Sequence, residues 1–163
     1  MNILVLCTGN SARSILLESI FNHHSRGRIE AFSAGSNPTG KVHPEALALL
    51  VEKGYPTEGL RSKSWDEFAL PDAPKMNFVI TVCGNARDEV CPIWPGAPLT
   101  GHWGIKDPAK IDRSPKATKA AFEVAFSVLE ARAKAWLMLM FENMAPNERQ
   151  SHIDRIGDSM LVM

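Results

Sequence analysis

The sequence predicts an α/β protein with a small, open, four-stranded parallel sheet and helices on both faces. Short apolar runs that contain β-branched residues alternate along the chain with longer segments of helical periodicity. Reactive side chains follow directly after two of the apolar runs, at Cys7 and Cys83. In open α/β sheets, functional groups gather at the carboxyl ends of the strands. We therefore expect a site at that edge of the sheet.

Four segments are predicted to be strands. Residues 3–6 and 28–33 are the first two, and Ala34-Gly35 ends the second. Residues 77–82 form an apolar run, which is typical of a strand buried on both faces of a parallel sheet. Residues 99–103 supply a short fourth strand.

Helical periodicity predicts three helices in the first 140 residues, over residues 15–24, 42–53 and 114–140. The first has an apolar face with Glu18 and Asn22 interleaved. Start and stop residues support these helices and a fourth, shorter one: Gly54 after the second helix, Ser64 before a short helix at residue 65, and Ser114 with Pro115 before the long helix.

The chain is long enough for one domain with its own core, to which we assign residues 1–140. Residues 141–163 are predicted to be a C-terminal helical extension, with a short helix over residues 147–156 that ends at Gly157. The end of the long helix is apolar on nearly all sides. We therefore expect the extension either to fold back over it or to lie at a homodimer interface.

Composition argues against several classes of function. The 163 residues contain 18 Lys and Arg and 18 Asp and Glu, so no net charge directs the chain to nucleic acid or an anionic membrane. The longest apolar run, residues 135–141, is far too short to span a bilayer. No signal peptide is expected, because the first apolar stretch is short and lacks a basic flank. Three cysteines suit a reducing cytosol. We expect a cytoplasmic protein without nucleic-acid or membrane partners.

The segment after the first strand has the composition of an oxyanion site. Cys7 is followed by a polar, glycine-bearing loop and the start of a helix, which together surround a concavity with backbone N–H groups. Arg13 can add a bidentate contact to two anion oxygens. With the Ser14 hydroxyl, these donors are expected to favour a thiolate at Cys7, which is a nucleophile when an oxyanion lies above it. The predicted oxyanion-binding residues are Thr8, Gly9, Asn10, Ser11, Ala12 and Arg13.

Two further cysteines lie close together in the sequence. Cys83 ends a strand predicted to lie near the first one, so its thiol can approach Cys7. A continuous helix between Cys83 and Cys91 would separate their Cα atoms by about 12 Å. A disulfide needs them within about 7 Å, so a bridge between them requires this segment to unwind. A zinc site with His102 is an alternative, but the spacing matches no common structural site, and we expect no bound metal.

The Cys-x5-Arg-Ser motif of Cys7, Arg13 and Ser14, directly after an N-terminal strand, resembles the low-molecular-weight tyrosine phosphatase family. That family also contains thioredoxin-coupled arsenate reductases. The resemblance covers about residues 1–140. It implies that Cys7 is the nucleophile, that Arg13 and the loop amides bind the anion, and that Ser14 stabilises the thiolate.

Two further segments are similar to the reductases of this family. The segment around Cys83 and Cys91 resembles their redox segment, in which one thiol attacks the nucleophilic cysteine and the next carries the disulfide to thioredoxin. Asp107, before a proline, resembles the general acid of the family. The Asp-Pro pair is followed by Ala109, where the phosphatases typically have an aromatic residue. It is preceded by His-Trp-Gly at residues 102–104, which the reductases tend to show.

The resemblance also implies a cation site beneath the loop. Some reductases of the family bind potassium there through an Asn, a Glu, a Ser and an Asp. Asn10, Glu18 and Ser33 match three of these positions, and Lys63 falls at the fourth. We expect the Lys63 ammonium to replace the potassium ion, because either cation compensates the charge of Glu18.

The first hypothesis for function is therefore an arsenate reductase with a relay of Cys7, Cys83 and Cys91. It uses Asp107 as the acid, no bound cofactor and thioredoxin as the external reductant. Because its substrate is a phosphate-like oxyanion, residual phosphatase activity is expected. Two alternatives stay open. A phosphatase would hydrolyse phosphomonoesters through Cys7, Arg13 and Asp107 but would not need the cysteine pair. A non-enzymatic redox or oxyanion sensor would not need the acid.

Overall fold

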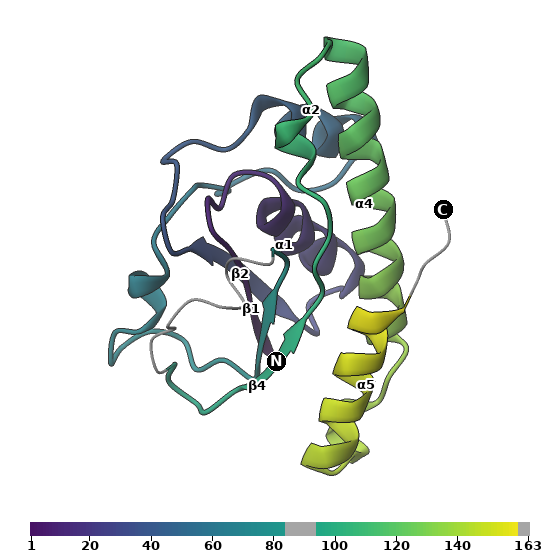
Figure 1. The fold of residues 1–163 in the computed structure, drawn as a ribbon. Helices are drawn as coiled ribbons and strands as arrows, with labels where there is room; N and C mark the ends of the chain where they lie inside the picture. Colours follow the sequence, from purple (N-terminus) through teal and green to yellow (C-terminus); the bar gives the residue numbers. More distant parts are fainter. Residues whose placement is uncertain (84–93, 160–163) are drawn as a thin grey trace.

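A computed structural model of the chain describes residues 1–83 and 94–159 (Figure 1). The elements of the described residues, with 3-10 helices marked η, are in chain order β1 (Asn2–Cys7), α1 (Arg13–His24), β2 (Glu30–Gly35), α2 (Pro44–Lys53), η1 (Trp65–Phe68), β3 (Phe78–Thr81), β4 (Leu99–His102), η2 (Pro108–Lys110), α4 (Pro115–Leu137), η3 (Phe141–Asn143) and α5 (Pro146–Asp158). No helix in the described part of the chain has both the length and the apolar character needed to cross a membrane.

The four strands form one parallel sheet in the order β2-β1-β3-β4, which confirms the predicted fold class. β1 lies inside the sheet, where Val5 is level with Ser33 on one side and with Ile80 on the other. Cys7, at the carboxyl end of β1, is level with Gly35 at the end of β2. The nucleophile predicted from the sequence therefore lies at the expected edge of the sheet.

Side chains alternate along β1 between two layers of the core. Ile3 and Val5 belong to the larger apolar cluster, which includes residues of α1, α2 and α4. Leu4 and Leu6 belong to the smaller cluster, which includes Trp65 of η1. Helical elements therefore cover both faces of the sheet, as predicted.

α1 is enclosed by its neighbours, since it contacts β1, β2, α2 and α4. Its residues from Ser14 to Phe21 are all buried, and Glu18 is one of them. The sequence placed Glu18 and Asn22 between the apolar positions of this helix. Asn22 is exposed, as a residue outside the apolar face would be, but Glu18 is not. A carboxyl group is therefore buried in the core, where it needs polar partners.

The predicted helix boundaries agree with the structure at most ends. Three of the predicted end residues have the expected geometry: Gly54 with φ 78°, Ser64 accepting from Asp66 N (3.1 Å), and Ser114 accepting from Ala117 N (3.0 Å). α4 ends at Leu137, before the predicted residue 140. Leu139 N donates to Trp136 O (3.0 Å), a tighter turn that closes the helix.

α5 packs along β4, the outer strand of the sheet, and beside α4 (Figure 1). Gln150 Nε2 donates to Thr100 O (2.7 Å), and Trp103 Nε1 donates to Ile153 O (3.1 Å). A Cβ atom on Gly101 would clash with Ile153, so β4 and α5 are as close as a glycine allows. The edge of the sheet is therefore covered by the C-terminal helix.

The prediction that the last helix ends at Gly157 is wrong, because α5 continues to Asp158. A Cβ atom on Gly157 would clash with the carbonyl oxygen of His102. Gly157 therefore permits the close approach of α5 to β4 and does not end the helix.

Gly157→Ala is expected to lower the free energy of unfolding by about 1–3 kcal/mol, because the methyl group must push α5 away from the backbone of β4. The measurement is denaturant unfolding of the variant and the wild type. Ser151→Ala, at an exposed position of the same helix, is the matched control and should change stability little. Unchanged stability of Gly157→Ala would show that α5 is not seated this closely.

Candidate active site

The loop that follows β1 is held in place by hydrogen bonds that its carbonyl oxygens accept from the backbone of residues 37–43. Cys7 is buried at the end of β1, and α1 begins at Arg13, so residues 8–12 connect a strand to a helix N-terminus. Three loop carbonyls accept backbone hydrogen bonds: Thr8 O from Asn37 N (3.0 Å), Gly9 O from Thr39 N (3.0 Å) and Ser11 O from His43 N (2.9 Å). In a trans peptide the N–H points away from the C=O. The amides that follow these carbonyls therefore point into the loop, as an oxyanion site requires.

Asn10 fixes the shape of the loop. It is fully buried and has a φ of 45°, a left-handed conformation that Asn adopts more easily than most residues. Its Nδ2 donates to Ser14 Oγ (2.8 Å) and Ser33 Oγ (3.0 Å), and its Oδ1 accepts from Lys63 N (2.9 Å). β2 continues through Gly35, so the prediction that Ala34-Gly35 ends this strand is wrong. A Cβ atom on Gly35 would clash with Thr8 O, so the end of β2 packs directly on the loop.

Arg13 and Asp107 lie together, although they are far apart in the sequence. Arg13 Nη2 is 3.2 Å from Asp107 Oδ2, and Arg13 Nη1 donates to Ile105 O (3.0 Å). Asp107 Oδ1 also accepts from Ala109 N (3.0 Å), at the start of η2. Within the described residues, Arg13 Nε is buried without a hydrogen-bond partner. The guanidinium thus holds the predicted acid through Nη2 and the backbone of Ile105 through Nη1, which leaves its Nε as a donor without a partner in the described part of the chain.

Cys83 lies against the loop and against Cys7. It is buried beyond the end of β3, where its sulfur accepts from Thr8 N (3.2 Å) and lies 3.4 Å from Thr8 Oγ1. The side chains of Cys7 and Cys83 hydrogen-bond to each other. The structure therefore brings together the first two thiols of the predicted relay. Cys91, the third, lies outside the described residues.

The expectation that Cys7 favours the thiolate form is wrong for this arrangement. The hydrogen bond with Cys83, followed by burial, raises the pKa of Cys7 above its ordinary range. Arg13 and the amide of Gly9 lower the pKa, as the sequence predicted, but their effect is smaller. The sequence identified the stabilising donors but not the effect of a second sulfur in contact with the first.

Ser14 is buried, and its hydroxyl oxygen accepts from Asn10 Nδ2 (2.8 Å). It is thus tied to the residue that shapes the loop. Its assignment as a thiolate-stabilising group stays a prediction, as do the roles of the other predicted site residues.

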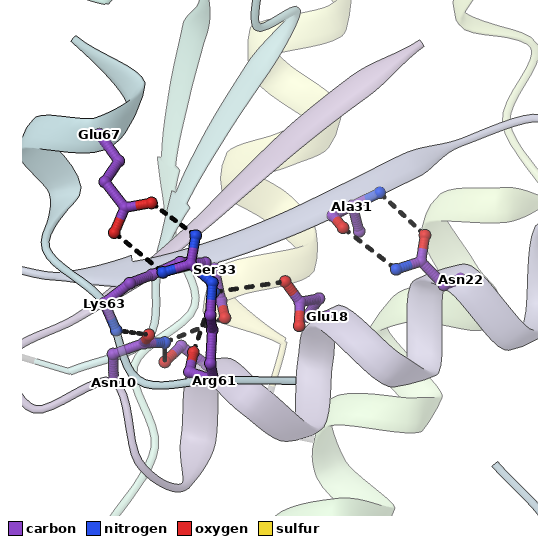
Figure 2. Close-up of polar contacts among 9 residues, drawn as sticks. Asn10, Glu18, Asn22, Ala31, Ser33, Arg61, Lys63 and Glu67 are labelled. Atoms are coloured by element: carbon purple, nitrogen blue, oxygen red, sulfur yellow. Dashed lines mark hydrogen bonds and ion pairs between the residues drawn. The ribbon is translucent and has the colours of Figure 1, made fainter. Parts of the chain in front are cut away.

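Beneath the loop, a buried polar network joins α1, β2 and the segment before η1 (Figure 2). Lys63 Nζ lies 4.0 Å from Glu18 Oε1 and donates to Arg61 O (2.9 Å). Glu18 is 7% exposed and Lys63 is 8% exposed. Burial raises the pKa of Glu18 to about 7, although Lys63 and Ser33 act to lower it. Burial also lowers the pKa of Lys63, against the attraction of Glu18.

The residues implied as potassium ligands do not fit a metal cation here. Asn10 directs its amide nitrogen, a donor, at Ser33, and its oxygen is used by Lys63 N. The ammonium of Lys63 already supplies a positive charge beside Glu18. The replacement of potassium by Lys63 stays a prediction that this geometry favours.

Two residues that matter for the site were missed from the sequence. Ile105 takes part through its carbonyl oxygen, which no sequence pattern reveals. Arg132 is a buried cation of α4 that donates to Trp103 O (2.9 Å). A signal for Arg132 was present, because it falls in the apolar stripe of the long helix between Leu129 and Trp136.

Comparison with known proteins gives consistent results. Residues 2–150 match the family described as low molecular weight phosphotyrosine protein phosphatase. An arsenate reductase of Shouchella clausii (strain KSM-K16) is 32% identical over 132 residues, which cover 81% of this chain and 91% of the relative.

Solved structures of arsenate reductases also match. That from Archaeoglobus fulgidus DSM 4304 has a TM-score of 0.64 at 25% identity, covering 84% of this chain and 99% of that one. A thioredoxin-dependent arsenate reductase from Corynebacterium glutamicum has a TM-score of 0.58 at 25% identity, covering 84% of this chain and 61% of that one. The resemblance first drawn from Cys7, Arg13 and Ser14 is confirmed, and the chain belongs to the low molecular weight phosphotyrosine protein phosphatase family.

Proposed function

We propose that this protein reduces arsenate to arsenite through a relay of Cys7, Cys83 and Cys91 that thioredoxin recycles. The contact between the sulfurs of Cys7 and Cys83 carries this proposal. Hydrolysis of a phosphomonoester needs one nucleophilic thiol, whereas reduction of an oxyanion needs two electrons. A pair of neighbouring thiols supplies two electrons when it becomes a disulfide.

The first step is formation of an adduct. The sulfur of Cys7 attacks the arsenic atom of arsenate, an As–S bond forms, and an arsenate oxygen leaves as water. Arg13 Nε and the loop amides bind the remaining oxygens, and the Asp107 carboxyl group, held at Arg13, supplies a proton to the departing oxygen. Because contact with Cys83 raises the pKa of Cys7, the proton of the Cys7 thiol must leave as the anion is attacked. Its acceptor is the Asp107 carboxylate, where it replaces the proton given to the departing oxygen, so that the net change is loss of one water molecule.

The second step is the reduction. The sulfur of Cys83 attacks the sulfur of Cys7, an S–S bond forms, and the As–S bond breaks with its electron pair remaining on arsenic. Arsenic(V) becomes arsenic(III), and arsenite leaves. Cys91 then attacks Cys83 and frees Cys7. The dithiol of thioredoxin reduces the Cys83–Cys91 disulfide.

Thioredoxin is proposed as the reductant for two reasons. The third thiol in the sequence provides a way to pass the disulfide onward, and a structural neighbour at 25% identity is a thioredoxin-dependent arsenate reductase. A relay of this kind requires a reducing compartment, so we place the protein in the cytoplasm.

The test is arsenate-dependent oxidation of NADPH in the presence of thioredoxin and thioredoxin reductase. Wild-type protein is expected to turn over continuously. Cys91→Ser is expected to release one arsenite per protein and stop, because the Cys7–Cys83 disulfide cannot be passed on. Cys83→Ser is expected to release none, since the adduct on Cys7 is not reduced.

Hydrolysis of an aryl phosphate is the matched control, because it needs Cys7 but neither of the other thiols. Cys91→Ser should hydrolyse this ester as fast as the wild type. Brisk hydrolysis of the aryl phosphate by the wild type, without any arsenate turnover, would contradict the proposal and show that the protein is a phosphatase. Continuous turnover in Cys91→Ser would keep the reductase and remove Cys91 from the mechanism.

A further inference from the structure

Arg132 joins the helix that flanks the site to the start of the segment that carries the acid. Its side chain is 7% exposed, and its Nη1 donates to Trp103 O (2.9 Å) and to Gly104 O (3.4 Å). Its Nη2 lies 3.5 Å from Ser159 O, at the end of α5. A guanidinium this deeply buried can only be accommodated with partners of fixed geometry. Here these partners are carbonyl oxygens of two separate segments.

The segment from Gly104 to Asp107, the acid loop, has an open space on one side. A groove of about 790 Å³ lies between this loop, α4 and the end of α5, lined among others by Ile105, Asp107, Val128 and Arg132. Packing from this side therefore does not fix the loop. The position of the acid loop depends on hydrogen bonds. Arg132 makes the hydrogen bonds to the carbonyl oxygens of Trp103 and Gly104, at the start of the loop.

The rest of the acid loop bonds to Arg13, through Ile105 and Asp107. Ile105 O accepts from Arg13 Nη1 (3.0 Å), and the carboxylate of Asp107 lies 3.2 Å from Arg13 Nη2. Only one peptide unit separates the Gly104 carbonyl, held by Arg132, from the Ile105 carbonyl, held by Arg13. A displacement of the Gly104 carbonyl at Arg132 therefore also moves the adjacent Ile105 carbonyl at Arg13, and with it the acid.

We propose that Arg132 is a positioning residue for the general acid, which sets the place of Asp107 at Arg13 by holding the carbonyl oxygens of Trp103 and Gly104. This inference rests on the proposed function, in which Asp107 protonates the oxygen that leaves arsenate. Arg132 itself touches neither the anion loop nor the thiols in the described part of the chain. Its effect on the acid passes through the acid loop.

Arg132→Met is expected to lower kcat for arsenate by about 10- to 100-fold, since a displacement of about 1 Å in a reacting group has effects of this size. KM should change much less than kcat, because the loop amides that bind the anion are held by contacts with residues 37–43. Arg132→Lys keeps the charge and one donor group, and should recover part of the loss. Lys134→Met, an exposed position on the same helix, is the matched control and should leave kcat unchanged.

The double variant separates positioning from a general structural role. In an Asp107→Asn background, Arg132→Met should cost little more than twofold, because the group that it positions is already absent. A loss as large in the Asp107→Asn background as in the wild type would overturn the proposal.

An independent measurement does not need activity. Ile105 N donates to Val82 O (3.2 Å), so its amide exchange reports the acid loop. Faster exchange at Ile105 in Arg132→Met, with unchanged exchange in Lys134→Met, is expected. Unchanged exchange in Arg132→Met would overturn the positioning role. If the wild type did not reduce arsenate, the proposed function would fail, and this exchange experiment would still decide whether Arg132 holds the loop.

Discussion

Replacing Arg13 with lysine is expected to lower kcat/KM for arsenate by about 10²- to 10³-fold, the usual effect of removing a preorganised donor from an oxyanion site. Lysine keeps the positive charge, so the loss in kcat/KM measures the contribution of the planar guanidinium geometry. Arg13 uses one nitrogen for Ile105 O and one for Asp107, and its buried Nε, which has no partner among the described residues, is the donor proposed for the anion. A lysine ammonium is a point charge that cannot face three directions with fixed spacing.

The measurement for Arg13→Lys is the thioredoxin-coupled assay, together with circular dichroism to show that the fold is retained. Arg113→Lys, at an exposed position before α4, is the matched control and should keep wild-type kcat/KM. Because Arg13 holds the acid and is proposed to bind the anion as well, kcat and KM should both worsen. A change confined to KM would contradict the part of this account in which Arg13 holds Asp107.

The parts of the fold and site that could be predicted from sequence are those decided by local chemistry. The strand before Cys7, the caps at Ser64 and Ser114, and the stop at Gly54 depend on residues within a few positions of each other. The donors around Cys7 were also local, because they belong to the loop that follows it. The proximity of Asp107 to that loop came instead from the resemblance to a family.

What could not be predicted depends on contacts between distant segments. The raised pKa of Cys7 results from Cys83, whose effect requires the actual distance between two strand ends. The burial of Glu18 requires that α1 has neighbours on every side. Gly157 looks like a helix stop in sequence, but its role is set by the backbone of β4.

Removing the positive charge beside Glu18 is expected to have the largest effect on stability. Lys63→Met should lower the free energy of unfolding at pH 8 by about 3–5 kcal/mol, the usual cost of leaving one member of a buried ion pair without its partner. Lys63 and Glu18 are both more than nine-tenths buried, so solvent cannot replace the lost charge. Lys116→Met, at an exposed position, is the control and should change stability little.

The pH dependence of this loss follows from the pKa of Glu18, which burial raises to about 7 from an ordinary 4.5. The folded state holds the Glu18 proton more tightly than the unfolded state does. The resulting stability is fully present below pH 4.5 and is lost as the pH rises through 7. In the wild type, loss of the Glu18 proton therefore lowers the free energy of unfolding by about 3 kcal/mol as the pH rises from below 4.5 to above 7. The deficit of Lys63→Met should therefore be small at pH 5, where Glu18 is protonated, and large at pH 8.

The double variant Glu18→Gln/Lys63→Met separates the loss of a charge from the loss of a long side chain. It should recover much of the stability at pH 8, because no buried charge remains. A deficit of Lys63→Met that is equal at pH 5 and pH 8 would show that packing, and not the charge of Glu18, explains the effect.

The same position tests whether lysine stands in place of a cation. In the wild type, exchange of sodium for potassium at constant ionic strength should change neither stability nor arsenate turnover, because Lys63 Nζ already lies beside Glu18. Lys63→Asp removes the ammonium and adds a carboxylate, so two buried carboxylates then face each other and require a cation. Potassium should stabilise this variant and leave Lys63→Met less affected, since methionine offers no oxygen ligand. Clear activation of the wild type by potassium would refute the replacement, because a site filled by lysine has no room for the ion.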